Sequence, residues 1–241
     1  MAAFWLIALT APPIADGTEG GSATLVERGR TVYMEQCMSC HGAQGDGRGE
    51  AAAYLNPPPR NFTTGVYKFR STMSGQLPTD DDLFRTITTG IAGTSMDDYA
   101  SLPERDRRAL VAYLKKLSPR FAQDQNGPPI AFPAPRPLTP ESAARGRSVY
   151  ERMQCAACHG EGARGDGPLA GDLSDTESLP IRPADLTKLQ LKGGRAPESV
   201  FRSVMTGLDG TPMPSYGDSL VPEEAWDLAL YILSLSSPKE K

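Results

Sequence analysis

The sequence contains the five-residue motif C-x-x-C-H twice, and this pair of motifs constrains the fold more than any other feature. The first copy spans residues 37–41 and the second spans residues 155–159. The chain has only 4 cysteines and 2 histidines, and the two motifs contain all of them. Because both copies have the same spacing, we expect two equivalent sites, each with two thiols and an imidazole on about one turn of helix.

C-x-x-C-H is the signature at which c-type haem is attached to a protein. Two thiols one helical turn apart can add to the two vinyl groups on one edge of the porphyrin, and the next residue places an imidazole under the iron. The sequence therefore predicts two covalently attached haem c groups, whose thioether bonds leave no free thiol. The predicted attachment residues and proximal ligands are Cys37, Cys40, His41, Cys155, Cys158 and His159.

Three other uses of paired cysteines fit the pattern less well. A disulfide in each motif gives no reason for the histidine that follows, and a shared four-cysteine zinc site leaves both histidines unexplained. A thioredoxin-like redox motif is expected within a strand–helix–strand unit, and the sequence shows no such alternation. Haem attachment accounts for the cysteines and the histidine of each motif together.

The segments around the two motifs repeat in the same order, which indicates a tandem duplication of one haem domain. The repeated segments are residues 28–33 and 145–150, 45–47 and 165–167, 83–87 and 200–204, 90–96 and 207–213, and 110–114 and 228–232. We expect a signal-like N-terminal segment (1–22), a first domain (23–118), a proline-rich linker (119–138) and a second domain (139–241). Dense proline favours an extended linker, either semi-rigid along the domain surfaces or a disordered tether.

Helical periodicity and helix-end signals predict an all-α fold, with few helices and long loops around each haem. The expected helices span about residues 23–37, 80–89 and 101–117, then residues from 139 with Pro140 in the first turn, 197–206 and 222–235. Leu25, Val32 and Tyr33 are expected to face inward, and residues 101–104 match a capping box. Gly29 and Gly146 fall inside expected helices, where glycine costs up to about 1 kcal/mol relative to alanine. That cost predicts a close approach between helices at both positions.

A haem held by one histidine has a sixth coordination position, and the sequence has no third histidine to fill it. The soft thioether of methionine is a known ligand of haem iron. Only Met96 and Met213 occupy matching positions in the repeat, each in the frame G-x-x-G-T-x-M. A lone methionine is usually a core residue, but the shared frame favours ligation. The predicted metal ligands are therefore His41, Met96, His159 and Met213.

Several polar groups are candidates for supporting each haem. A backbone carbonyl of Pro58 or Pro59, and of Pro183, could accept the Nδ1 proton of the ligating histidine. Tyr99 and Tyr216 follow the predicted ligand methionines by three residues and could hydrogen-bond near the haem or shield its edge. Other candidates, which could pair with haem propionates or be solvated surface charges, are Arg60, Lys68, Arg70, Arg182 and Lys188.

With the attachment motif near the start, the methionine loop late and a helix at the end, both halves resemble class I c-type cytochrome domains. The tandem arrangement, from about residue 23 to residue 236, resembles periplasmic dihaem cytochromes c. This resemblance implies an electron-transfer protein with the attachment residues and ligands named above. The chain differs from the most compact members of that family in its long loops and its proline-rich linker.

Histidine–methionine ligation raises the haem reduction potential and fills both axial positions, which favours electron transfer over catalysis at the iron. The leading expectation is a periplasmic carrier of single electrons between respiratory donor and acceptor complexes, with no catalytic residue and no small-molecule substrate. The alternatives are a fixed electron-transfer subunit of a larger membrane-associated oxidoreductase and, less favoured, a dihaem peroxidase. With 25 basic and 29 acidic side chains, the net charge of −4 argues against a nucleic-acid partner.

Residues 2–9 form a short apolar stretch, and small residues follow it. This pattern resembles the end of a secretory signal, and the stretch is too short to cross a bilayer. Covalent haem attachment also implies export, by the family resemblance. We therefore expect a periplasmic or other extracytoplasmic location, with a retained N-terminal anchor as the alternative.

Overall fold

The computed structural model describes residues 18–125, 127–188 and 190–236, with side chains described from residue 23 onward. The apolar stretch at residues 2–9 lies outside these ranges. The described part of the chain is all-α: it contains no strand, and a single isolated β-bridge joins Ser174 and Pro180. None of its helices combines the length and the apolar character that a bilayer span requires.

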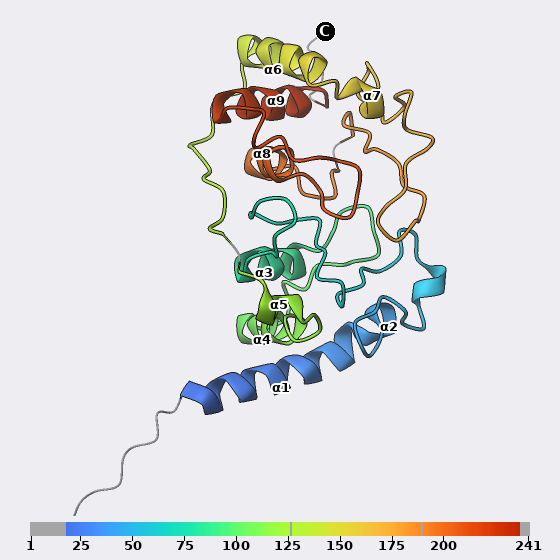
Figure 1. Cartoon of the computed structure of the whole chain (residues 1–241), viewed down its shortest axis with the longest axis vertical. Coiled ribbons are helices and arrows are strands. Elements are labelled where there is room, and N and C mark those ends of the chain that lie inside the picture. Colours follow the sequence, from blue (N-terminus) through green and yellow to red (C-terminus); the bar gives the residue numbers. More distant parts are fainter. Residues whose placement is uncertain (1–17, 126, 189, 237–241) are drawn as a thin grey trace, which may run out of the picture.

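The helices form two sets that are stacked along the long axis of the molecule (Figure 1). The first set is α1 (Thr18–Gln36), α2 (Met38–His41), the 3-10 turn η1 (Ala52–Tyr54), α3 (Asp80–Thr89) and α4 (Glu104–Leu114). The short helix α5 (Arg120–Gln123) follows, and the second set is α6 (Pro140–Arg152), α7 (Ala156–His159), α8 (Pro197–Thr206) and α9 (Pro222–Ser234). We refer to α1–α4 as the first domain and to α6–α9 as the second domain. α3 and α8 are the innermost helices, and α2 and α7 lie on the same side of the molecule.

Local signals fix most helix ends. Thr79 and Thr139 each close a capping box, which satisfies free backbone amides at the start of α3 and α6. The bounds predicted for α3 and α8 are confirmed, and both helices end at a glycine with positive φ. The capping box predicted at residues 101–104 is wrong, because α4 begins after Pro103 and no side chain caps it. Leu25 also differs from the prediction, since it is 40% exposed.

Gly29 and Gly146 lie where two helices cross in direct backbone contact. A Cβ atom at Gly29 would overlap the backbone carbonyl of Ala109 on α4, and one at Gly146 would overlap that of Asp227 on α9. The predicted close approach is therefore confirmed in both domains. An ion pair seals each crossing: Arg28 pairs with Asp106, and Arg145 pairs with Asp227 at 2.7 Å.

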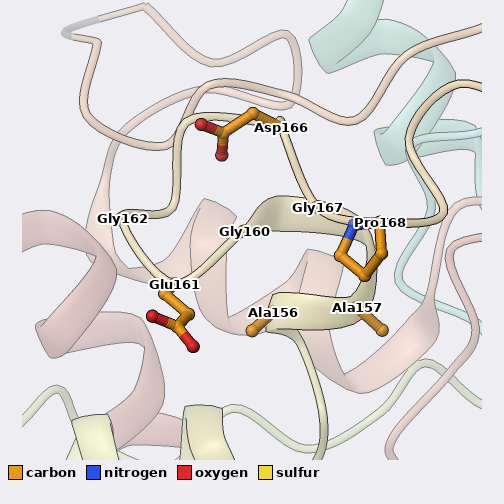
Figure 2. A pocket seen from close by; sticks show the side chains of 8 residues that line it. All are labelled: Ala156, Ala157, Gly160, Glu161, Gly162, Asp166, Gly167 and Pro168. Atoms are coloured by element: carbon orange, nitrogen blue, oxygen red, sulfur yellow. The ribbon is translucent and has the colours of Figure 1, made fainter.

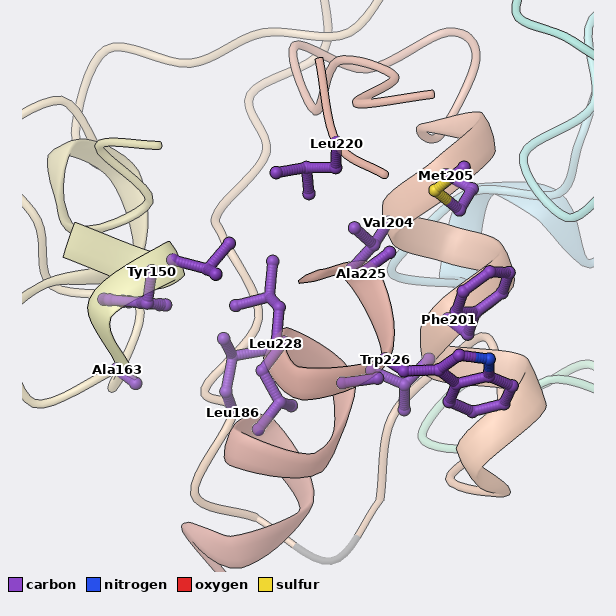
Figure 3. Packing of buried hydrophobic residues seen from close by; sticks show 14 residues of the cluster. Tyr150, Ala163, Leu186, Phe201, Val204, Met205, Leu220, Ala225, Trp226 and Leu228 are labelled. Carbon is purple, nitrogen blue, oxygen red and sulfur yellow. The ribbon is translucent and has the colours of Figure 1, made fainter. Parts of the chain in front are cut away.

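The core of the second domain gathers on α8 and α9 (Figure 3). The rings of Phe201 and Trp226 stack at 4.4 Å between centroids, and both side chains are almost fully buried. Cys155 packs against the edge of this core, as Cys37 does against the core of the first domain. Each attachment motif is thus anchored on the apolar centre of its own domain.

The segment between the domains lies along both of them. Its start differs from the extended linker predicted for residues 119–138, because residues 120–123 form α5. Farther along, the Ile130 amide donates to the Ser71 carbonyl of the first domain at 2.7 Å, while its side chain packs on the second core. Phe132 contacts Phe201 at 5.8 Å between ring centroids. The linker is therefore a surface-bound segment rather than a loose tether.

Candidate haem sites

His41 lies at the end of α2, where a backbone carbonyl and an aromatic ring hold its imidazole. Its Nδ1 lies 3.0 Å from the carbonyl oxygen of Arg60, so Nδ1 carries the proton and donates it. The ring of Phe62 stacks on the imidazole at 4.4 Å. Burial lowers the pKa of His41, which favours the neutral imidazole. The hydrogen bond at Nδ1 fixes this tautomer and leaves Nε2 as the atom that can bind iron.

His159, at the end of α7, repeats this arrangement. Its Nδ1 lies 3.0 Å from the carbonyl oxygen of Ala184, and burial lowers its pKa as well. In both domains the accepting carbonyl belongs to the residue after the proline rather than to Pro59 or Pro183, so that prediction is wrong by one position. A proline at the preceding position leaves the chain extended, and the next carbonyl is the one that points at the ring.

The loop after each attachment helix folds back on the histidine in the same way. The amide of Gly47 donates to the carbonyl of His41 at 2.9 Å, and the amide of Gly165 donates to that of His159 at 2.8 Å. Gly47 is therefore the structural counterpart of Gly165. The match predicted between residues 45–47 and 165–167 is therefore wrong by two residues. Both segments read G-D-G, but residues 45–47 lie two positions nearer to their histidine than residues 165–167 do.

A buried tyrosine ties each attachment helix to its domain. The hydroxyl of Tyr33 on α1 donates to the carbonyl of Gly42 at 2.8 Å, and that of Tyr150 on α6 donates to the carbonyl of Gly160 at 2.7 Å. Both hydroxyls anchor the residue that directly follows the histidine. Burial raises the pKa of both tyrosines, so they stay protonated as donors.

Tyr33→Phe and Tyr150→Phe are each expected to lower the free energy of unfolding by about 1–2 kcal/mol, because a buried carbonyl loses its donor. Urea unfolding of the haem-loaded protein measures this loss. Tyr54→Phe is the control, since Tyr54 is 88% exposed, and its effect should stay within about 0.5 kcal/mol. Equal stability of all three variants would show that these hydroxyls do not anchor the attachment helices.

The two methionine loops have the same internal hydrogen bonds. In the first domain the hydroxyl of Thr94 donates to the carbonyl of Ile91 at 2.8 Å and accepts from the amide of Met96 at 3.1 Å. In the second domain Thr211 bonds to Leu208 at 2.7 Å and to Met213 at 3.2 Å in the same manner. The threonine of the G-x-x-G-T-x-M frame therefore sets the backbone direction at each methionine.

Each methionine loop continues into a tyrosine that lies beside the attachment cysteines. Tyr216 lies beside the Cys155 side chain; burial first, and then the nearby Cys155, raise the pKa of Tyr216 to about 12. Tyr99 lies near Cys37 and Cys40, and its hydroxyl donates to the carbonyl of Gln36 at 3.1 Å. The structure thus brings the methionine loop of each domain and the C-x-x-C-H motif of the same domain to a common site.

The candidate propionate partners divide into two groups. Arg70 is fully buried, with its Nη2 bonded to Thr206 and Asp209, but its Nη1 has no hydrogen-bond partner among the described residues, so Arg70 stays a candidate. Lys68 is half-buried; burial, followed by the charge of Arg60, lowers its pKa to about 8. Arg60 and Lys68 lie in the segment that follows the first histidine and are also candidates to pair with an anionic group. Arg182 and Lys188 are exposed.

A buried polar atom without a hydrogen-bond partner indicates that a haem fits the first site. The hydroxyl of Tyr67 is buried and, among the described residues, has no hydrogen-bond partner. Its ring stacks with Phe62 at 6.1 Å, and Phe62 in turn stacks on His41. A buried hydroxyl needs an acceptor, and a haem in this site carries carboxylate groups that could supply one.

A surface pocket lies on the second attachment motif, at α7 (Figure 2). It is lined by Ala156, Ala157, Gly160, Glu161, Gly162, Asp166, Gly167 and Pro168, and none of the proposed iron ligands is among them. The zinc alternative also finds no support in the geometry. Within residues 18–125, 127–188 and 190–236, no three His, Cys, Asp or Glu side chains are grouped as a metal site.

Two family models match the chain, one in each half. The model described as cytochrome c matches residues 26–118, and the model described as cytochrome C oxidase, cbb3-type, subunit III matches residues 141–232. Each match contains one attachment motif and one methionine loop. The two motifs therefore belong to two separate domains of known type.

Comparison with whole proteins gives the same assignment. The chain is 25% identical over 211 residues to the Cbb3-type cytochrome c oxidase subunit CcoP of Azospirillum sp. (strain B510), a match that covers 88% of this chain and 62% of that protein. The chain thus spans about three fifths of the length of this curated relative. It also matches a chain in the structure of the Kuenenia stuttgartiensis reducing HAO-like protein complex Kustc0457/Kustc0458. That match has 41% identity and a TM-score of 0.84, and it covers 87% of this chain and 96% of that one.

Proposed function

The chain belongs to the dihaem c-type cytochromes, with two cytochrome c domains that bind two covalent haem c groups, and on this premise we propose how its residues serve electron transfer. Cys37 with Cys40, and Cys155 with Cys158, form the thioether bonds. His41 and Met96 ligate the first iron, and His159 and Met213 ligate the second. Haem iron supplies reversible one-electron chemistry, and the protein passes single electrons between redox proteins.

The matching geometry of the two sites carries this proposal. Each histidine is held as a neutral imidazole by a carbonyl at Nδ1, and each methionine is set by the same threonine-centred loop. With one histidine and one methionine to hold each iron, a small substrate would find no free coordination site, which favours electron transfer over catalysis. As neutral groups, the imidazole and the thioether would hold the iron without taking up a proton.

Absorption spectra of the reduced protein with and without carbon monoxide, together with haem quantitation, test the proposal. We expect two haems per chain and no change on addition of carbon monoxide, because both irons are six-coordinate. A carbon monoxide shift at either haem would contradict the ligation and favour the peroxidase-type alternative, which needs an exchangeable axial position.

A second candidate function is that of a fixed subunit in a larger oxidoreductase. It is favoured by the 41% identity to a chain that occurs in a protein complex. Size-exclusion chromatography of the native protein, with identification of co-purifying chains, distinguishes the two functions. A stoichiometric partner supports the subunit, and a free monomer supports the mobile carrier.

We place the protein outside the cytoplasm, in the periplasm or at an extracytoplasmic membrane surface. Support comes from the need to attach two haems covalently and from the apolar segment at residues 2–9. Fractionation of cells that produce the full chain tests this location. Recovery of the haem-loaded protein from the cytoplasm would overturn it.

A further inference from the structure

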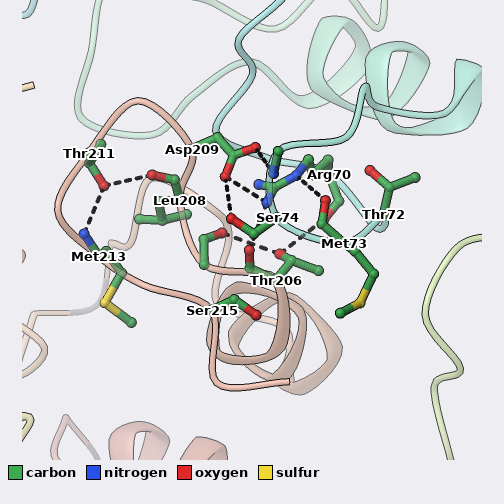
Figure 4. A network of polar contacts seen from close by, with 12 residues as sticks. Arg70, Thr72, Met73, Ser74, Thr206, Leu208, Asp209, Thr211, Met213 and Ser215 are labelled. Carbon is green, nitrogen blue, oxygen red and sulfur yellow. Dashed lines mark hydrogen bonds and ion pairs between the residues drawn. The ribbon is translucent and has the colours of Figure 1, made fainter. Parts of the chain in front are cut away.

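The loop that carries Met213 is held by the other domain. Asp209 lies near the tip of this loop, and its carboxylate accepts three hydrogen bonds (Figure 4). The donors are Nη2 of Arg70 at 2.7 Å, the hydroxyl of Ser74 at 2.9 Å and the amide of Gly75 at 2.9 Å. All three donors belong to the first domain, so a single carboxylate joins the two halves of the chain.

Arg70 makes this contact specific, because its side chain is fully buried. Besides Asp209, its Nη2 donates to the carbonyl of Thr206 at 2.8 Å, and its Nε donates to the carbonyl of Met73 at 3.2 Å. Thr206 is the last residue of α8 and directly precedes the methionine loop. Arg70 therefore binds the start of this loop directly and binds its tip through Asp209. A buried guanidinium needs a carboxylate partner, so each of the two charges depends on the other.

The first domain offers a natural comparison. Its methionine loop has the same internal hydrogen bonds, but the residue equivalent to Asp209 is Ala92, which is exposed. No matching contact runs in the other direction either: among the described residues, no hydrogen bond or ion pair joins the second domain to residues 90–96. Within the described part of the chain, the second methionine loop alone is thus held from outside its own domain.

We propose that Arg70 and Asp209 are positioning residues for Met213, so that the first domain maintains the sixth ligand of the second haem. This inference rests on the proposed ligation by Met213. It predicts that loss of the pair affects one haem out of two. The affected haem is that of the second domain, although Arg70 lies in the first domain.

The test uses two variants of the haem-loaded full chain. The first is Asp209→Ala, which gives the second loop the residue that the first loop has at Ala92. The second combines Arg70→Met with Asp209→Ala, so that both charges are removed. The readouts are the sulfur-to-iron(III) charge-transfer absorption, the carbon monoxide difference spectrum and the two reduction potentials. We expect the absorption to fall by about half, one haem to bind carbon monoxide and one potential to drop. Asp209→Asn keeps the shape of the side chain, so it should fold readily and show a smaller change of the same kind.

Ala92→Asp is the matched control and should leave both haems unchanged. The single variants Met96→Ala and Met213→Ala separate this inference from the proposed ligation. If neither methionine variant loses half of the absorption, the proposed ligation fails. If both methionine variants lose half of the absorption, the ligation stands. The positioning role alone is then overturned if the Asp209 variants and the double variant keep the full absorption and bind no carbon monoxide.

Discussion

Gly146→Ala is expected to lower the free energy of unfolding by about 3 kcal/mol or more, and Gly29→Ala by a similar amount. At both positions a Cβ atom would overlap a backbone carbonyl of the facing helix, and a backbone cannot rotate away as a side chain can. Overpacking in a close-packed interior typically costs about 1–3 kcal/mol. The rigid neighbour places these two substitutions at the upper end of that range or beyond it, and the helices must move apart.

Urea unfolding of the haem-loaded variants measures the effect. Gly171→Ala is the control, because Gly171 has no atom near its added Cβ and does not have a positive φ. It should change the stability by less than about 0.5 kcal/mol. If Gly29→Ala and Gly146→Ala are as stable as Gly171→Ala, the helices of each domain do not cross as closely as described.

Met96→Ala and Met213→Ala are each expected to lower the reduction potential of one haem by on the order of 0.1 V or more, since axial ligands set haem potentials over about 0.8 V. Each variant should also open one iron, so that one haem of two binds carbon monoxide. Separate redox titrations of the two variants assign the two potentials of the native protein to the two domains.

Met205→Leu provides the control for these variants, because Met205 is a buried core residue that lies outside both loops. It should leave both potentials and the carbon monoxide response unchanged. A native response in Met96→Ala or Met213→Ala would remove that methionine from the ligand set. A large shift in Met205→Leu would instead show that the potential depends on core packing.

The helices could be predicted because their ends are marked locally. Thr79 and Thr139 each have their capping partner within three residues, and Gly90 and Gly207 end their helices through their own backbone conformation. The close helix crossings could also be predicted, since an unfavourable Gly29 or Gly146 inside a helix needs a reason in packing. Repetition of each signal in both halves strengthened these predictions.

The contacts between the domains could not be predicted, because they join residues far apart in the sequence. Arg70 and Asp209 carry no local signal of their pairing, and as a lone cation Arg70 matched a haem propionate equally well. The carbonyl partners of the histidines were missed by one residue, since the direction of a carbonyl depends on the exact turn. The start of α4 was missed because Pro103 itself occupies the capping position.

The innermost helices, α3 and α8, are equivalent in the repeat, and both lie toward the boundary between the two halves (Figure 1). Arg85 and Arg202 hold the same position in the two copies, and burial together with the charge of Arg85 lowers the pKa of Arg202 to about 10. The hydrogen bonds across this boundary nevertheless join unlike segments, since residues 70–75 of the first domain bond to residues 206–209 of the second. The surface-bound linker makes this association intramolecular, at an effective concentration on the order of millimolar. The chain is thus a pair of related domains joined by one peptide, and the unequal residues Asp209 and Ala92 give each member of the pair its own surroundings.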